Sequence, residues 1–310
     1  MSCSRRAFLG TLASTALARA AAAPAAEPPA FKGTVCLFSK HLPLLEARAL
    51  GRAVKPLGFG GVDLTVRPGG HVPPERAGTD LAPFVRALRA EGLDVPMIST
   101  ALVSASDPAA AAILETAGRE QVRYFKAGYF RYRFADVRRE IEEAGQALRG
   151  LAELGARHGV QLGYHNHAGY VGGPVWDIAR VMDTLDPRAA GYYFDVRHAV
   201  VEGGDAGWRT ALLYAAPRLK MVAVKDFFWE KTDAGWKQRN CPLGQGMVDW
   251  KAFFAILAGA SFHGPVSLHL EYDIPGATPA AQQEHTLAAA ARDLGFLTAH
   301  LGAAYRGAGS

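Results

Sequence analysis

The chain has 310 residues, of which 49% are hydrophobic and 20% are charged, a composition typical of a folded globular protein. The formal net charge of +5 includes three arginines near the N-terminus, so the remainder is nearly neutral and lacks the basic stripe expected of a nucleic-acid-binding surface. After the N-terminal segment no run of about 18 apolar residues occurs, so we expect no stable membrane insertion.

The N-terminal segment has the order of residues found in export signals. The pair Arg5-Arg6 precedes Phe8-Leu9, a short Ala-rich apolar stretch and a region of small residues and prolines. This order resembles a twin-arginine signal, which implies export of an already folded protein to the periplasm or beyond. We therefore expect residues 1–26 to be an export signal, the alternative being a disordered basic tail.

Eight short apolar runs alternate with eight helical stretches along the rest of the chain. The runs are rich in β-branched, aliphatic and aromatic residues, as buried parallel strands are. The predicted strands are Val35–Phe38, Gly61–Val66, Val95–Ser99, Arg123–Ala127, Gln161–His165, Gly191–Asp195, Met221–Lys225 and Val266–Leu270. The predicted helices are Leu44–Pro56, Pro83–Glu91, Pro108–Gly118, Phe134–His158, Val175–Leu185, Trp208–Ala215, Trp250–Gly259 and Pro279–Leu301.

This alternation predicts an α/β protein with a single (β/α)8 TIM barrel over residues 31–303. The rival architecture is an open doubly wound sheet, which would carry a glycine-rich phosphate turn after its first strand. The turn here is Ser39-Lys40-His41-Leu42-Pro43, without glycine. The segment Leu243-Gly244-Gln245-Gly246 is not a phosphate-binding P-loop either, because it lacks a lysine and a preceding strand.

In a barrel of this kind the chemistry is located at the C-terminal ends of the strands. The last four predicted strands each end in ionisable residues, which are His165 and His167, then Asp195 with His198, then Lys225, then His269 and Glu271. Alternate residues of a strand share a face, so the members of each His165/His167 and His269/Glu271 pair are expected to point the same way. A carboxylate that ends an apolar run is costly unless it is paired or binds a cation.

Carboxylates and imidazoles around one point suit a divalent metal such as Mn, Mg, Co or Zn. A metal of this kind polarises a carbonyl, and a positioned base then removes the proton on the adjacent carbon. Arg67 and Lys126, at the second and fourth predicted strands, are further candidates for contact with a hydroxylated ligand.

These motifs together resemble the sugar phosphate isomerase/epimerase family, whose fold is a xylose isomerase-like barrel. The resemblance covers about residues 31–303. Its most specific motifs are Tyr164-His165-Asn166-His167, Asp195-Val196-Arg197-His198, Val224-Lys225-Asp226, Pro242–Gly246 leading to Asp249-Trp250, and Leu268-His269-Leu270-Glu271-Tyr272. The resemblance implies a divalent metal at the ends of strands five to eight and proton transfer on small polyols and keto sugars.

Two of the four ligand positions of that family are changed in this chain. Asp195 and Glu271 match, whereas His165 stands in place of the fifth-strand Glu and Ala223 in place of the seventh-strand His. The resemblance then implies a metal set of His165, Asp195 and Glu271, with Glu271 or Lys225 as the catalytic base. The predicted substrate contacts are His167, His198, Lys126, His269 and Arg67.

Three functional hypotheses follow. The first is an exported, metal-assisted isomerase or epimerase that acts on a small sugar, keto sugar or polyol. The second is a dehydratase, or a deglycosidase that acts by elimination, on 3-keto sugars at the same site. The third is a metal-free periplasmic sugar-binding protein, since a fold alone does not guarantee chemistry. All three take a small carbohydrate as the partner and none requires nucleic acid; the sequence leaves the substrate and the oligomeric state open.

Overall fold

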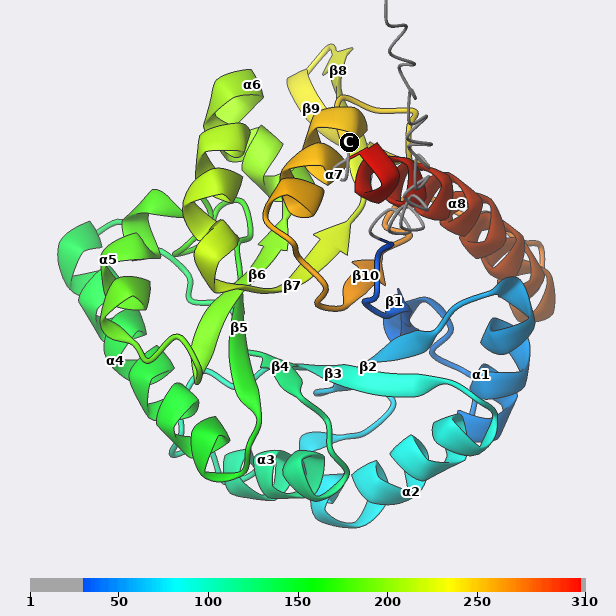
Figure 1. Cartoon of the computed structure of the whole chain (residues 1–310), viewed down its shortest axis with the longest axis horizontal. Coiled ribbons are helices and arrows are strands. Elements are labelled where there is room, and N and C mark those ends of the chain that lie inside the picture. The colour runs from blue at the N-terminus through cyan, green and yellow to red at the C-terminus, as the bar shows by residue number, and fades with distance from the viewer. Residues whose placement is uncertain (1–29, 308–310) are drawn as a thin grey trace, which may run out of the picture.

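Eight parallel strands close into a barrel in this computed structural model, which describes residues 30–307. Around the barrel the strands follow chain order, and β10 pairs with both β7 and β1 to complete the circle. Figure 1 shows the helices as an outer ring around these strands. The predicted (β/α)8 barrel is therefore confirmed, while the predicted signal over residues 1–26 lies outside the described residues.

The strands are close to those predicted from the apolar runs. They are β1 Val35–Phe38, β2 Gly61–Val66, β3 Asp94–Thr100, β4 Tyr124–Lys126, β5 Gln161–His165, β6 Ala190–Asp195, β7 Leu219–Val224 and β10 Val266–Leu268. Lys225 follows β7 and His269 follows β10, so these two residues lie just beyond the strands that were expected to contain them, and Glu271 lies two residues farther along. All three still lie at the C-terminal mouth of the barrel.

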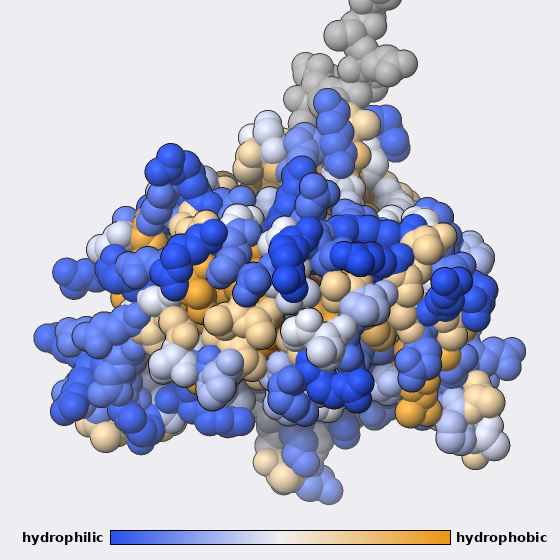
Figure 2. Space-filling model, turned by 90° about the horizontal axis from the view of Figure 1, so that it is seen from below, coloured by the Kyte–Doolittle hydropathy of each residue, from blue (hydrophilic) through white to orange (hydrophobic). Residues whose placement is uncertain are grey.

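The helices cover the outside of the barrel with their apolar faces. They are α1 Ala47–Val54, α2 Ala77–Ala90, α3 Ala110–Arg119, α4 Val137–Arg157, α5 Trp176–Thr184, α6 Val196–Ala215, α7 Trp250–Gly259 and α8 Pro279–Gly307. None of the helices described between residues 30 and 307 is both long and apolar enough to span a bilayer. Figure 2 shows one outer face, on which hydrophilic side chains predominate and apolar ones form scattered patches.

Helix α6 begins much earlier than its predicted start at Trp208. The Asp195 side chain accepts a hydrogen bond of 3.1 Å from the backbone N–H of His198, and this N-cap starts the helix at Val196, directly after β6. The prediction was wrong here because Gly203 and Gly204 break the helical pattern. Gly204 adopts a positive φ of 59°, a kink inside the helix.

The barrel interior below the mouth is filled by a small apolar cluster. Met97, Tyr193, Met221 and Ala223 pack there from β3, β6 and β7. A Cβ atom on Gly163 of β5 would lie 1.9 Å from Cε of Met221, so glycine at this position gives the methionine its space. This cluster fills the barrel interior directly beneath the polar groups of the mouth.

An antiparallel hairpin that was not predicted follows β7. It consists of β8 Asp226–Thr232 and β9 Gly235–Cys241, and Figure 1 shows it in yellow between α6 and α7. Most of its residues are exposed, although Phe227 is buried at its base. The hairpin is thus an insertion between β7 and α7 on the side of the barrel where the strands end.

Asp226 fastens the base of this hairpin to the segment that leads into α7. Its fully buried carboxylate accepts hydrogen bonds from the backbone N–H groups of Phe227, Gly244, Gly246 and Val248 and from Nε1 of Trp250, at 2.8 to 3.3 Å. A Cβ atom on Gly246 would lie 2.2 Å from the Asp226 carboxylate. The Pro242–Gly246 motif therefore has a structural role, because its backbone N–H groups bind the Asp226 carboxylate. We call these hydrogen bonds the Asp226 cluster.

Asp226→Asn should lower the free energy of unfolding by about 3 kcal/mol, because an amide NH2 would face N–H donors in a buried site and leave them unsatisfied. The measurement is urea unfolding followed by fluorescence. Asp233→Asn, at the exposed hairpin turn, is the matched control and should change stability little. Equal unfolding midpoints for the two variants would contradict a stabilising role of the Asp226 cluster.

Candidate active site

The C-terminal mouth of the barrel contains a partly enclosed cavity of about 120 Å³. Phe38, Tyr129 and Tyr193 supply aromatic walls. The predicted site residues on its lining are Arg67, Lys126, His165, His167, Lys225, His269 and Glu271. The remaining two, Asp195 and His198, are buried directly behind them and contact Lys225, His165 or His167. The structure thus brings together side chains that are far apart in the sequence, as the strand-end pattern predicted.

Four larger hollows are less suited to chemistry. A hollow of about 670 Å³ lies between α4 and α5, outside the barrel, and another of about 450 Å³ lies between the end of β9 and α8; neither is lined by a predicted site residue. Two more remain. One of about 840 Å³ lies at the opposite end of the barrel, among residues that start β3 and β4, where barrel enzymes do not place their active sites. The other, of about 440 Å³, is a groove between the segment after β1 and the start of α8. It shares Lys40 with the 120 Å³ cavity but is lined by none of the predicted site residues. The smaller cavity is therefore the candidate site.

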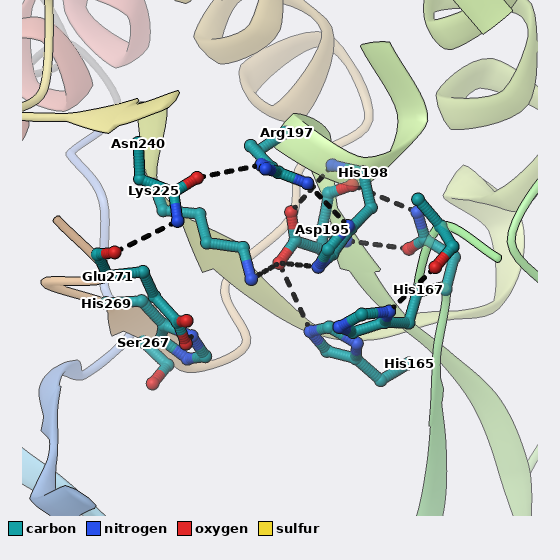
Figure 3. Close-up of polar contacts among 12 residues, drawn as sticks. His165, His167, Asp195, Arg197, His198, Lys225, Asn240, Ser267, His269 and Glu271 are labelled. Atoms are coloured by element: carbon teal, nitrogen blue, oxygen red, sulfur yellow. Dashed lines mark hydrogen bonds and ion pairs between the residues drawn. The ribbon is translucent and has the colours of Figure 1, made fainter. Parts of the chain in front are cut away.

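Asp195 is the buried centre of one half of the site. Its Oδ2 lies 3.1 Å from Nζ of Lys225, 3.3 Å from Nε2 of His165 and 3.9 Å from Nε2 of His198 (Figure 3). Burial alone would raise the pKa of the Asp195 carboxyl, but Lys225 and the two imidazoles outweigh burial and hold it well below its ordinary value. Asp195 is therefore a carboxylate whose charge is balanced chiefly by Lys225.

The two imidazoles beside Asp195 are neutral. Burial lowers the pKa of His165 to about 3 and also lowers that of His198 well below its ordinary value. Arg197 lies 3.2 Å from Nδ1 of His198, and the Tyr129 hydroxyl lies 3.4 Å from Nδ1 of His165. The Arg197 guanidinium can only donate, so Nδ1 of His198 accepts and the ring proton of His198 lies on Nε2, whereas the Tyr129 hydroxyl can donate to or accept from Nδ1 of His165.

This arrangement does not fit the predicted metal set of His165, Asp195 and Glu271. The Asp195 oxygen that faces His165 is already paired with the Lys225 ammonium at 3.1 Å, so a metal would have to displace that ammonium. Glu271 contacts Lys40 and His269 instead. Between residues 30 and 307, no three His, Cys, Asp or Glu residues are grouped so as to hold a metal ion.

Glu271 is the centre of the other half of the site. Its Oε1 lies 3.0 Å from Nζ of Lys40 and 3.6 Å from Nδ1 of His269. Burial by itself raises the pKa of Glu271, but His269, Lys225 and Lys40 together lower it well below its usual range. Glu271 is therefore an anion at neutral pH, and Lys225 is electrostatically coupled to both carboxylates of the site.

The hairpin helps to position both halves. Asn240 of β9 donates a hydrogen bond of 2.9 Å to the backbone carbonyl of Glu271, and its own side-chain oxygen accepts one of 3.1 Å from Arg197 (Figure 3). Arg197 also lies over the ring of Phe227, 4.9 Å from its centroid. A chain of contacts thus runs from the hairpin to Glu271 on one side and to His198 on the other.

Asp63 is a buried site residue that the sequence analysis missed. This carboxylate of β2 accepts hydrogen bonds from Ser99, Ser267 and Tyr193, and burial raises its pKa. The Tyr193 hydroxyl also lies 3.2 Å from Nε2 of His269. The sequence signal was present, since Asp63 stands alone in the middle of an apolar strand, where a carboxylate needs partners.

Lys126 and Lys225 are both buried at the mouth, yet their surroundings differ. Lys225 makes the ion pair with Asp195, whereas Lys126 places Nζ 3.6 Å from the ring centroid of Tyr129. Burial, with the nearby Arg67 and Lys225, lowers the pKa of Lys126 to about 7 despite an opposing effect of Asp63. Lys126 is thus an amine that changes its charge near neutral pH.

The predicted contact residues His167 and Arg67 also line the cavity. The ring of His167 lies 3.8 Å from that of His198, measured between centroids, and burial lowers the pKa of His167 as well. The Arg67 guanidinium lies over the ring of Phe38, 5.5 Å from its centroid. These side chains present hydrogen-bonding groups to the cavity from opposite walls.

The sequence matches the Xylose isomerase-like TIM barrel family over residues 52–299. The chain belongs to this family. Inosose dehydratase of Bacillus anthracis is 27% identical over 151 residues, which are 45% of this chain and 50% of that protein, so the chain spans about half the length of the curated relatives it matches.

Solved structures share the fold at lower identity. A structure of L-ribulose 3-epimerase has a TM-score of 0.66 and 17% identity, over 89% of this chain and 97% of the other. The 3-keto-D-glucoside 4-epimerase from E. coli has a TM-score of 0.63 and 17% identity, over 84% and 99%. A xylose isomerase-like barrel protein from Mycobacterium smegmatis, in complex with magnesium, has a TM-score of 0.62 and 16% identity, over 87% and 98%. The xylose isomerase-like barrel fold is thus established for this chain.

A double-mutant cycle tests the pair at the centre of the site. Lys225→Met should lower the free energy of unfolding by about 3–5 kcal/mol, because the buried charge of Asp195 loses its main partner. Asp195→Asn, which keeps the N-cap of α6, should recover part of this loss in the double variant. The same cycle on the exposed pair Asp186–Arg188 is the control and should give a coupling of about 1 kcal/mol or less. Additive effects at Asp195 and Lys225 would contradict a buried ion pair.

Proposed function

We propose that this protein is an enzyme that isomerises or epimerises a small keto sugar by moving a proton on the carbon next to the carbonyl. The observation that carries the proposal is the cavity of about 120 Å³ at the barrel mouth, lined by amines, imidazoles, a carboxylate and hydroxyl groups. Pockets for drug-sized ligands measure about 300–1,000 Å³, so this cavity suits a small polar molecule. Membership of the Xylose isomerase-like TIM barrel family and the fold shared with sugar epimerases support the same chemistry.

The proposed reaction requires stabilisation of a negative charge. When the C–H bond next to a carbonyl breaks, the proton passes to a base and the electron pair moves onto the carbonyl oxygen, giving an enediolate. Lys225, Lys40 and Arg67 place positive charge around the cavity. These cations would stabilise the negative charge that develops on the carbonyl oxygen. Return of the proton to the neighbouring carbon gives an isomer, and return to the opposite face of the same carbon gives an epimer.

The predicted catalytic residues Glu271 and Lys225 have distinct parts in this proposal. The ionised Glu271 accepts hydrogen bonds from substrate hydroxyl groups, and Lys225 stabilises the developing oxyanion. The divalent metal that the resemblance implied would act as a Lewis acid on the same oxygen. Because the donors around Asp195 do not suit a metal, we assign the stabilising positive charge to Lys225.

Dehydration is the second candidate, since the relative from Bacillus anthracis is an inosose dehydratase. From the same enediolate, the C–O bond of a hydroxyl group on the next carbon breaks as the base passes its proton to that oxygen, which yields water and an unsaturated ketone. Loss of an alkoxy group would instead make the protein an eliminating deglycosidase of 3-keto glycosides. NMR of the products separates these reactions, and a pure sugar-binding protein would give binding without any product.

Glu271→Gln should reduce kcat/KM by about 10²-fold, because a neutral amide also donates hydrogen bonds and no longer balances Lys40 and Lys225. The assay is NMR in D2O on a panel containing L-ribulose, D-fructose, D-allulose and a 3-keto-D-glucoside, which records deuterium uptake next to the carbonyl as well as products. Glu284→Gln on the exposed surface of α8 is the control. No deuterium uptake by the unmodified protein with any of these sugars would overturn the proposed function.

We also propose that the chain is exported by the twin-arginine route, on the basis of Arg5-Arg6 and the segment that follows. Replacement of both arginines by lysine should retain the protein in the cytoplasm, because that route reads the arginine pair. Fractionation of cells followed by immunoblotting measures the distribution. Arg48→Lys on α1 is a control that should be exported normally. Unchanged export of the double-lysine variant would argue against this route.

A further inference from the structure

We propose that Lys126 is the group that removes and returns the proton, because its amine lines the cavity without a carboxylate partner. The inference rests on the proposed function and identifies the base that the reaction needs. It differs from the assignment implied by the family resemblance, in which Glu271 or Lys225 was the base.

The position of Lys126 suits a proton-transfer group. Lys126 is the last residue of β4 and therefore lies at the C-terminal mouth of the barrel. It is only 4% exposed, so bulk water has little access to its side chain. Among residues 30–307, Nζ of Lys126 forms no ion pair with a carboxylate, and its close contact is the face of the Tyr129 ring at 3.6 Å. Burial disfavours the ammonium form of Lys126, and the face of an aromatic ring offsets this cost only in part. The neutral amine is therefore favoured here.

The two bases implied by the resemblance are poorly suited to the task. Lys225 is held as an ammonium by Asp195 at 3.1 Å and therefore has no lone pair to accept a proton. Glu271 is stabilised as an anion by Lys40 and His269, which makes it a weak base. A general base works best when its pKa is close to the working pH. Lys126 meets that condition, since its pKa is lowered to about 7.

The charged groups that surround Lys126 come from two other strands, β2 and β7, and from the residues that follow them. Arg67 after β2 and Lys225 after β7 disfavour its ammonium form, whereas Asp63 of β2 favours it. Asp63 is already engaged by Ser99, Ser267 and Tyr193, so it does not form an ion pair with the amine. The balance leaves an amine that is neutral in a large share of molecules at neutral pH.

The proton transfer balances without any further reagent. The neutral Nζ forms an N–H bond as the substrate C–H bond breaks, and the electron pair moves to the carbonyl oxygen to give the enediolate. The resulting ammonium of Lys126 then returns its proton to the former carbonyl carbon on the same face, and the hydroxyl proton of the enediolate moves to the other oxygen, which restores the amine and gives the isomeric carbonyl compound. Epimerisation would need a second group to deliver a proton to the opposite face. The rate should rise with pH as Lys126 loses its proton, so kcat/KM should increase through about pH 7 and then level off.

The first experiment uses the deuterium-uptake assay on Lys126 variants of the full chain. Lys126→Met and Lys126→Arg should each lower kcat by about 10²–10⁴-fold with a smaller change in KM, since neither provides a neutral amine. In Lys126→Ala, added ethylamine should restore part of the rate, and the rescue should grow with the fraction of neutral ethylamine. The control is Lys220→Met. Lys220 lies near the start of β7, is half-buried and donates a hydrogen bond to the side chain of Gln161. Full activity of Lys126→Arg would overturn the proposal.

The second experiment does not depend on the substrate. Lysines are dimethylated with ¹³C-formaldehyde, and the methyl signals are followed by NMR as the pH is raised. The signal that is missing from Lys126→Arg should titrate near pH 7, whereas that of Lys220 should titrate at a higher pH. Titration of Lys126 near the ordinary lysine value of about 10.4 would overturn the inference even if sugars are turned over. Titration near pH 7 without any deuterium uptake would retain the unusual amine and reject the proposed function.

Discussion

The arrangement of the barrel mouth depends on one constraint, the complete burial of the Asp195 carboxylate. A buried charge is tolerated when it is paired and hydrogen-bonded, and here the partners come from both neighbouring strands. His165 approaches from the end of β5 and Lys225 from the end of β7, and the same carboxylate caps α6 through the N–H of His198. One side chain thus joins the ends of β5, β6 and β7 and caps the start of α6.

The engagement of Lys225 by Asp195 leaves the two buried lysines with different properties. Opposite charges near 3 Å favour the ionised forms of both partners, whereas burial without a partner favours the neutral amine. Lys225 therefore provides a permanent positive charge, and Lys126, next to Tyr129, provides an amine that exchanges protons near neutral pH. Reactions that form an enediolate need both a stabilising cation and a base, and two residues of the same type supply them through their surroundings alone.

The barrel and most of the mouth were predictable from the sequence, because each buried strand is a local apolar run that ends in a polar residue. The hairpin Asp226–Cys241 was not, since its one apolar run, Phe227–Trp229, is short and its second strand is largely polar and exposed. The metal set was predicted by position, yet its two carboxylates are engaged by lysines, Asp195 by Lys225 and Glu271 by Lys40. Such contacts arise only after distant segments have folded together.

Lys225 and Asp226 show how neighbouring residues connect the site to its cover. Lys225 directs its ammonium to Asp195 inside the mouth, while Asp226 gathers the backbone N–H groups that hold the hairpin and the segment before α7. Asn240 of the same hairpin holds the backbone of Glu271. The position of both carboxylate clusters therefore depends on one turn of the chain after β7. Loss of the Asp226 cluster should weaken the ion pair between Lys225 and Asp195 as well as the stability of the fold, because Asp226 holds the peptide next to Lys225 in place.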